Sequence, residues 1–338
     1  MYSKMVNHSN RSKRIRIILV LCLLTLLGYA VVSLADKGPG TTGKTTTPVA
    51  PKTSGPRAAS LYDAICTGSV GLDVPAKLKT SDIGELSGLT ASRTTEDTYW
   101  AHNDSGDKAL LYAIKTDGSL LGSVELSEIA AFDWEAIASG PGPVGGKSYL
   151  YIADTGDNGL DRTEVEIHRL VEPALPRGGN EAKVSQVETL RFTYPNDEKH
   201  NVEAMFVDPI TGKIYLIDKS EERLAIIYEA PAGLANQSAT TLRQVSDVSY
   251  PKGRKGFERV TGADISPSGD TIAIRTYESL HTYRREPGSA VATAFAGKVC
   301  SAPTIGEPQG EAVAFNKDGT MLITIGEGRT QPIHRLLY

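Results

Sequence analysis

The sequence predicts an all-β fold, a β-propeller of five four-stranded blades, on three observations. From about residue 62 onward the chain consists of short strand-like runs separated by Gly, Pro, Asp and Asn, with almost no sustained helical period. One unit of several strands repeats five times along this part. The last repeat ends at Tyr338 before a fourth strand, so a strand from the N-terminal side has to complete the ring.

Each repeat begins with a short strand that ends in a turn, and a second and a third strand follow. The first strands read LSGLTAS, WEAIASGP, VEAMFVDP, TGADISPSG and GEAVAFNKDG. Their aligned positions, Gly88, Glu135, Glu203, Gly262 and Glu311, recur at intervals of 47, 68, 59 and 49 residues. These intervals are typical of four-stranded propeller blades. The longest interval has room for extra strands, which leaves a six-bladed ring open.

Residues 62–70, YDAICTGSV, are the predicted closing strand of the last blade. This pairing would remove the exposed edges of the sheet. It places Cys66 in the outer strand of the last blade and Cys300 in the outer strand of its neighbour. In an exported protein such a pair is expected to form a disulfide, and two buried free thiols are the alternative.

The first 35 residues form an export segment. Five basic residues between Lys4 and Arg16 precede an uncharged apolar run over residues 17–35. This run is either a cleaved signal peptide or a retained membrane anchor. Residues 36–60 are a linker rich in Thr, Pro and Gly, and residues 61–338 form the propeller domain. The positive-inside rule sends the domain outward, so we expect an extracytoplasmic protein, either secreted or membrane-anchored.

The charge balance argues against nucleic acid as a partner. The whole chain has 36 Lys and Arg and 40 Asp and Glu, and the export segment holds five of the basic residues and none of the acidic ones. The remainder therefore carries 31 basic against 40 acidic residues, a net charge of −9. No GxSxG or HExxH motif occurs, which argues against a common serine hydrolase and against a zincin metalloprotease.

The repeat gathers many acidic residues at one mouth of the ring. The start of the first strand and the end of the second strand of every blade lie at the same mouth. The first strands bring Glu85, Asp133, Glu135, Glu203 and Glu311. The second strands bring Asn103, Asp104, Asp107, Asp154, Asp157, Asn158, Asp218, Lys219, Arg275, Glu327 and Arg329. Converging carboxylates repel one another unless cations offset them, and oxygen ligands favour Ca²⁺ or Mg²⁺. We predict a Ca²⁺ site formed by Asp104, Asp154, Asp157, Glu135, Glu203 and Glu311.

Simpler roles stay open for the same residues. Asp and Asn beside Gly at a strand end are ordinary turn formers. The glutamates could be architectural acceptors of backbone NH groups. His102 and His200 are candidate bases or ligands, or structural hydrogen-bonding residues. The basic residues Lys219, Arg275 and Arg329 either bind an anionic group or balance the acidic rim.

The motifs ELSGL, DWEAIA, IADTGDN, NVEAMFVDP and GEPQGEAVA resemble a group of bacterial exported β-propeller proteins that is often placed with phytase-like or esterase-like propellers. The resemblance spans residues 65–338. It implies a calcium-holding mouth and a phosphoester or ester hydrolase activity. It also implies that Lys219, Arg275 and Arg329 bind phosphate beside Asp154, Asp157 and Glu203. The mouth has few basic residues for a phytase, so phytate itself is not expected.

Three functional hypotheses follow, and in each we expect a monomer. The first is a metal-assisted hydrolase of esters or phosphoesters. Its metal is held by Asp104, Asp154, Asp157 and Glu203, and its catalytic residues are Glu203, Asp154, Lys219 and Arg275. The second is a non-catalytic surface propeller that binds a glycan, a peptide or an envelope component. The third is a five-bladed glycosidase with Asp104 and Glu203 as its carboxylate pair.

Overall fold

The computed structural model describes residues 60–338, apart from 105, 107, 176–179, 220–223, 233, 235–237, 251–257 and 304. The predicted export segment and most of the linker lie outside these described residues, and so does Asp107. Within the described part of the chain, no helix has both the length and the apolar character needed to cross a membrane.

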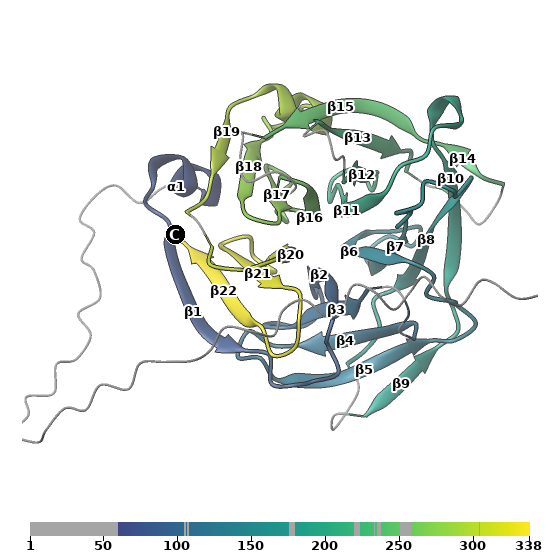
Figure 1. Cartoon of the computed structure of the whole chain (residues 1–338), viewed down its shortest axis with the longest axis horizontal. Coiled ribbons are helices and arrows are strands. Elements are labelled where there is room, and N and C mark those ends of the chain that lie inside the picture. Colours follow the sequence, from purple (N-terminus) through teal and green to yellow (C-terminus); the bar gives the residue numbers. More distant parts are fainter. Residues whose placement is uncertain are drawn as a thin grey trace, which may run out of the picture. The chain divides into compact units, whose positions relative to one another are not determined.

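Five sheets stand around a common centre, and each is one blade of the predicted propeller (Figure 1). The first blade contains β2 (Leu86–Ala91), β3 (Tyr99–Asn103), β4 (Leu110–Ile114) and β5 (Leu120–Leu126). The second contains β6 (Trp134–Pro141), β7 (Ser148–Asp154), β8 (Val165–Val171) and β10 (Glu188–Thr193). The third contains β11 (Val202–Val207), β12 (Ile214–Asp218), β13 (Leu224–Ala230) and β15 (Arg243–Ser249).

The fourth and fifth blades complete the ring. The fourth contains β16 (Val260–Ile265), β17 (Thr271–Thr276), β18 (Leu280–Arg284) and β19 (Val299–Ser301). The fifth contains β20 (Gly310–Phe315), β21 (Met321–Gly326), β22 (Pro332–Leu337) and, from the other end of the domain, β1 (Gly71–Lys77). The innermost strands contact one another in the closed order β2, β6, β11, β16, β20 and back to β2. The fold class predicted from the repeat is therefore confirmed.

The long interval between the second and third repeats holds an extra strand rather than a sixth blade. Strand β9 (Glu181–Val184) runs parallel to β5 and extends the first blade to five strands. A two-residue strand, β14 (Thr240–Thr241), extends the second blade in the same way by pairing with β10. The six-bladed alternative is therefore wrong.

The ring is closed by a different segment from the one predicted. Strand β1 pairs antiparallel with β22, from Gly71 opposite Leu337 to Lys77 opposite Pro332. The predicted closing strand over 62–70 is wrong, because most of it lies in a helix, α1 (Leu61–Thr67). The side chain of Ser60 caps the first turn of this helix, and Gly68 ends it with a left-handed φ of 70°. Four apolar side chains of the helix are buried against the ring.

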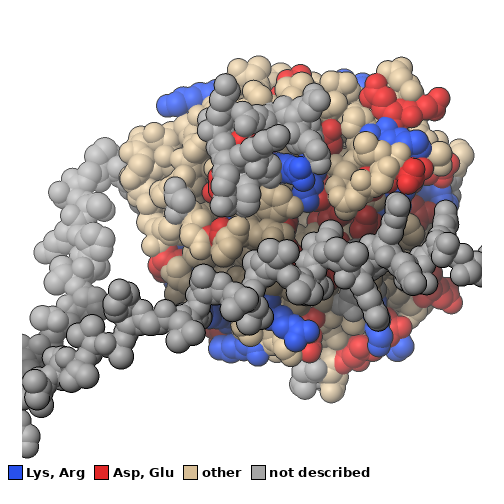
Figure 2. Space-filling model, in the orientation of Figure 1, with Lys and Arg blue, Asp and Glu red and all other residues tan. Residues whose placement is uncertain are grey.

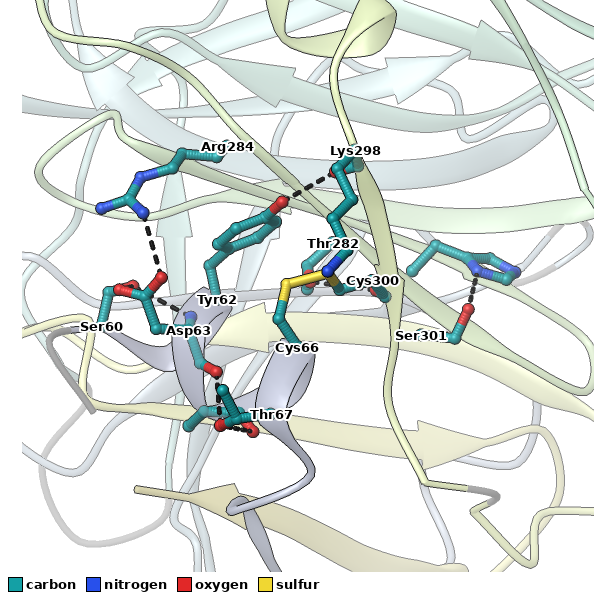
Figure 3. The surroundings of a disulfide bond; sticks show 12 residues. Ser60, Tyr62, Asp63, Cys66, Thr67, Thr282, Arg284, Lys298, Cys300 and Ser301 are labelled. Carbon is teal, nitrogen blue, oxygen red and sulfur yellow. Dashed lines mark hydrogen bonds and ion pairs between the residues drawn. A yellow bond between two sulfur atoms is a disulfide. The ribbon is translucent and has the colours of Figure 1, made fainter. Parts of the chain in front are cut away.

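The predicted disulfide between Cys66 and Cys300 is present, so the free-thiol alternative is wrong (Figure 3). It joins α1 to β19, with the two Cα atoms 5.0 Å apart. Two polar contacts fix the helix on the same edge of the fourth blade. The Tyr62 hydroxyl donates to the carbonyl oxygen of Lys298 at 2.8 Å, and Arg284 Nη1 lies 3.0 Å from Asp63 Oδ1. The helix α1 is thus bound to the fourth blade, while β1, which follows it, closes the fifth blade.

Every innermost strand contains a bulge immediately after its first residue. The strand register shifts between Leu86 and Gly88 in the first blade, and at the equivalent place in the other four. The five bulge residues are Ser87, Glu135, Glu203, Thr261 and Glu311. A bulge redirects one side chain out of the regular alternation. The aligned positions Gly88 and Gly262 are therefore one residue late, and Ser87 and Thr261 are the true counterparts of the three glutamates.

Candidate functional site: an acidic cavity at the channel mouth

A cavity of about 140 Å³, which we call the mouth cavity, lies where the five blades meet. Every blade contributes to its lining, which consists of Glu85, Leu86, Ser87, Asp104, Glu135, Asn158, Glu203, Lys219, Tyr277, Gln309, Glu311 and Glu327. Six of these side chains are carboxylates and one is a cation. On the face shown in Figure 2, acidic atoms are visible in the recess near the middle. The predicted convergence of strand ends at one mouth is therefore confirmed.

Three carboxylates at this mouth, which we call the acidic trio, are close enough to share one metal ion. Asp104, Asp133 and Glu135 each offer an oxygen atom, and these atoms all lie within 4.8 Å of one another. Gly156 allows the approach of the neighbouring loop, because a Cβ atom at this position would collide with the carboxylates of Asp133 and Glu135. The Gly of the TGDN motif therefore serves close packing against the acidic trio.

Glu135 is the member of the acidic trio with the least compensation. Its residue is only 4% exposed. Among the described residues, its carboxylate has one hydrogen-bond partner, the Ser87 hydroxyl, at 3.4 Å from Oε2. That hydroxyl lies nearer to the backbone oxygen of Glu135, at 2.8 Å, and has only one proton to donate. Burial raises the pKa of Glu135 to about 11, with Glu203, Asp104 and Asp133 adding to the rise. A buried carboxylate without a committed donor is costly unless a cation binds it.

On the side of the third and fourth blades, the mouth cavity holds an ion pair. Lys219 Nζ contacts Glu203 Oε1, and Asn201 Nδ2 donates to the same oxygen at 3.1 Å. The ammonium group also lies 5.0 Å from the centroid of the Tyr277 ring. Burial disfavours the charge of Lys219, but Glu203 and Tyr277 outweigh it and raise the lysine pKa. Lys219 is thus committed to Glu203 in the resting site.

In the fifth blade, Gln309 bridges two carboxylates of the mouth cavity. Its Nε2 atom donates to Glu311 Oε1 at 3.1 Å and also contacts Glu327. Burial raises the pKa of Glu311 to about 8, and Glu203 adds to the rise. Burial also raises the pKa of Glu327. At neutral pH Glu311 therefore holds a proton.

Asp154 and Asp157 do not line the mouth cavity. The backbone NH of Phe132 donates to Asp154 Oδ2 at 2.9 Å, and Arg162 Nη1 donates to Oδ1 at 2.8 Å. Asp157 accepts two NH groups of the following turn, from Asp161 and Arg162, both at 2.9 Å. These contacts are those of turn-forming acceptors. Asp154 also accepts the NH of Asp133 at 3.3 Å, so it positions a member of the acidic trio.

Replacing Asp154 by Asn is expected to lower the free energy of unfolding by about 2 kcal/mol, because a buried, charge-assisted hydrogen bond to Arg162 is lost. Urea unfolding followed by circular dichroism measures this loss. The conservative change Asp161→Asn, in the same loop, serves as the control, because the NH of Asp161 that contacts Asp157 is retained. An Asp154→Asn variant as stable as the parent would contradict the structural role.

The other predicted residues lie away from the mouth cavity. Arg275 is fully buried, with Nη2 2.5 Å from Glu307 Oε2, in a network that includes His334. His102 is fully buried and packs edge-on against Trp134 at 5.6 Å, and burial lowers its pKa. His200 contacts Asp218 at 3.0 Å and, although burial opposes it, that carboxylate raises the histidine pKa. These geometries are those of structural residues.

Three polar residues of the mouth cavity, Ser87, Tyr277 and Gln309, were not predicted from the sequence. Ser87 was hidden by the one-residue error in the alignment of the first blade. Tyr277 follows the end of the second strand of the fourth blade, and Gln309 precedes the first strand of the fifth. Gln309 occurs within one of the motifs that carry the family resemblance, GEPQGEAVA, but neither Gln309 nor Tyr277 is acidic. A search for strand-end residues of any polar type would have found them.

No protein-family model matches this chain, and no curated protein matches it. Among solved structures, it is similar to XC5397, a gluconolactonase from Xanthomonas campestris, with a TM-score of 0.48 and 10% identity over 86% of this chain and 98% of that one. It is also similar to the Cps50 (Swd1) β-propeller domain of Myceliophteria thermophila, with a TM-score of 0.39 and 11% identity over 79% of this chain and 100% of that one. The strand pairing of this chain itself defines the fold as a five-bladed β-propeller, and the propeller has an acidic mouth cavity. The resemblance to phytase-like and esterase-like propellers stays a prediction.

Proposed function

We propose that this protein is an extracytoplasmic, metal-dependent ester hydrolase with Ca²⁺ bound at the acidic trio. The observation that supports it most is Glu135, a buried carboxylate with no committed hydrogen-bond donor, beside two further carboxylates within ligand distance of one ion. Multiple carboxylate oxygens are the ligands that Ca²⁺ prefers. The ligand set differs from the one predicted from sequence. Asp133 enters it, whereas Glu203 and Glu311 line the mouth cavity outside the acidic trio. Asp154 and Asp157 instead accept hydrogen bonds within their own loop region.

The residues around the ion provide the rest of the chemistry. A bound Ca²⁺ would supply a Lewis acid for the ester carbonyl and for the attacking water. Glu203 faces the same cavity and takes the proton from that water as it attacks, then returns it to the leaving alkoxide. Once Glu203 is protonated, its charge no longer holds Lys219. The lysine ammonium is then available to stabilise the negative charge on the carbonyl oxygen.

The charge of the mouth cavity favours esters over phosphoesters. Six carboxylates line it, and its one cation, Lys219, is paired with Glu203. Arg275, which was expected to bind phosphate, is paired with Glu307 away from the cavity. A dianionic phosphate group would therefore meet net repulsion. We therefore expect esters, rather than phosphoesters, to be the substrates.

The disulfide supports the extracytoplasmic assignment, because such bonds persist in oxidising compartments. The apolar run over 17–35 supplies an export route in either of its forms, cleaved or retained. The binding-propeller and glycosidase alternatives stay predictions, and turnover measurements separate them from the ester hydrolase.

The full-length protein is expected to hydrolyse p-nitrophenyl acetate in the presence of Ca²⁺ and to leave p-nitrophenyl phosphate almost untouched. The change Glu203→Gln should lower kcat at least about 100-fold, because it removes the general base. Its Ca²⁺ affinity, measured by calorimetry, should change far less, since Glu203 lies outside the acidic trio. If no ester in a broad panel is turned over with Ca²⁺ or Mg²⁺, the hydrolase proposal fails.

Calcium affinity is expected to rise with pH. Burial holds the pKa of Glu135, a member of the acidic trio, at about 11, so the metal-free site carries a proton that Ca²⁺ must displace. Each proton released on binding makes the affinity about tenfold higher per pH unit below the pKa. Calorimetric titrations at pH 6, 7 and 8 in buffers of different ionisation enthalpy measure both quantities. A Kd that does not change with pH would contradict a protonated resting site.

A further inference from the structure

A second cleft, of about 300 Å³, opens beside the mouth cavity, and we call it the Arg329 cleft. Ser81, Asp82, Gly84, Glu85, Asn103 and Arg329 line it. Glu85 also lines the mouth cavity, so the two spaces share a wall. One small molecule could therefore place one end in each.

The wall between the two spaces is held by hydrogen bonds of its own. Asn103, at the end of β3, accepts the NH groups of Gly84 and Glu85 with its Oδ1 atom, at 3.1 and 3.2 Å. Its Nδ2 atom donates to the carbonyl oxygen of Asp82 at 2.9 Å. Three hydrogen bonds from one side chain thus fix the loop over residues 82–85. A wall that is already ordered binds a ligand without a further ordering cost.

Arg329 supplies a positive charge to the Arg329 cleft. Of the three basic residues that the sequence analysis singled out, Lys219 is paired with Glu203 and Arg275 with Glu307. Among the described residues, Arg329 has no hydrogen-bond or ion-pair partner. Its side chain runs along Gly84, where an added Cβ atom would stand 3.5 Å from Nε and 3.6 Å from Cγ.

The backbone on either side of Arg329 adopts unusual conformations. Gly328 has a φ of 111° and Thr330 a φ of 52°. A β-branched residue such as threonine in the left-handed region is strained, and such strain is often retained where it presents a functional group. The residue that this turn presents to the cleft is Arg329.

We propose that the Arg329 cleft binds a carboxylate group of the substrate while the ester bond of the same molecule reaches the mouth cavity. This inference rests on the proposed ester hydrolase function and names its substrate class. A guanidinium group matches a carboxylate with two parallel hydrogen bonds. The exposed carboxylates of Asp82 and Glu85 line the same cleft, so a second negative charge on the ligand is disfavoured. These charges select a monoanionic carboxylate over a phosphate.

The test compares two matched esters, phenyl acetate and 4-acetoxybenzoate, which differ by one carboxylate. With the Ca²⁺-loaded full-length protein, the KM for 4-acetoxybenzoate should be at least about tenfold lower, as expected for a charge-assisted hydrogen bond. Arg329→Gln should remove this preference by raising the KM for 4-acetoxybenzoate to that for phenyl acetate. Arg329→Lys should restore part of it. Arg191→Gln, at an exposed arginine on the outer strand of the second blade, is the matched control.

A preference for 4-acetoxybenzoate that survives in Arg329→Gln overturns the proposal, and so does a wild-type protein without any preference. If neither ester is hydrolysed, the proposed function fails and the cleft is tested by binding alone. Calorimetric titration of the Ca²⁺-loaded protein with 4-hydroxybenzoate should then show binding that Arg329→Gln weakens about tenfold or more. Absence of binding to the wild-type protein, or equal binding to the variant, overturns the carboxylate site.

Discussion

Replacing Glu135 by Gln is expected to weaken Ca²⁺ binding at least about 100-fold and to abolish ester hydrolysis. The change keeps the size of the side chain but removes the charge of the most buried member of the acidic trio. Changes in the outer shell of a metal site alone cost about 10–100-fold in affinity, so loss of a direct ligand should cost at least as much. Calorimetric titration with Ca²⁺ measures the loss. The control is Glu188→Gln, a change at a surface carboxylate that pairs with Arg169.

The metal-free proteins should differ in a second way. Glu135 has its pKa raised by burial from 4.5 to about 11, so its stabilising contribution is complete below pH 4.5 and is lost as pH rises toward 11. Within this window, one carboxyl group with such a raised pKa lowers the free energy of unfolding by about 1.4 kcal/mol for each unit that the pH rises. Without Ca²⁺, the free energy of unfolding of the Glu135→Gln variant should therefore decline less steeply between pH 5 and 8 than that of the parent protein. Identical pH profiles and unchanged Ca²⁺ affinity would together refute the metal site.

Removal of the disulfide is expected to have the largest effect on stability. The Cys66→Ala/Cys300→Ala double variant should lose about 3–5 kcal/mol of unfolding free energy, because the bond closes a loop with a sequence separation of 234 residues. Denaturant unfolding of the two proteins measures the difference. The parent protein treated with a reducing agent should match the variant, and the reducing agent should leave the variant unchanged. Equal midpoints for oxidised parent and variant would show that the contacts of Tyr62 and Asp63 suffice to hold the helix.

The fold was predictable because its information is repeated. Five strands of similar sequence at regular spacing establish the blades even when one interval contains an insertion, as β9 shows. The closing strand occurs once, and nothing in the repeat constrains its position. The apolar residues of 61–65 fit a short helix as well as a strand, and the caps at Ser60 and Gly68 decide for the helix.

The candidate site was predictable in location but not in detail. The repeat places Glu135, Glu203 and Glu311 at one mouth, and the structure brings all three to one cavity. Sequence alone could not tell which oxygens face that cavity. Asp154 and Asp157 look like metal ligands in ADTGDN. Their carboxylate oxygens instead accept hydrogen bonds from backbone NH groups and from Arg162, and only the folded loop brings these donors within reach.

The bulge that recurs in the five innermost strands separates the shape of the channel from its chemistry. Its backbone is repeated in all five blades, while its side chain is Ser, Glu, Glu, Thr or Glu. A polar residue can therefore be exchanged at one of these five positions with little demand on the surrounding sheet. The five bulge positions are thus equivalent in the backbone, and the charge of the channel can change by substitution in one blade at a time while the fold stays the same.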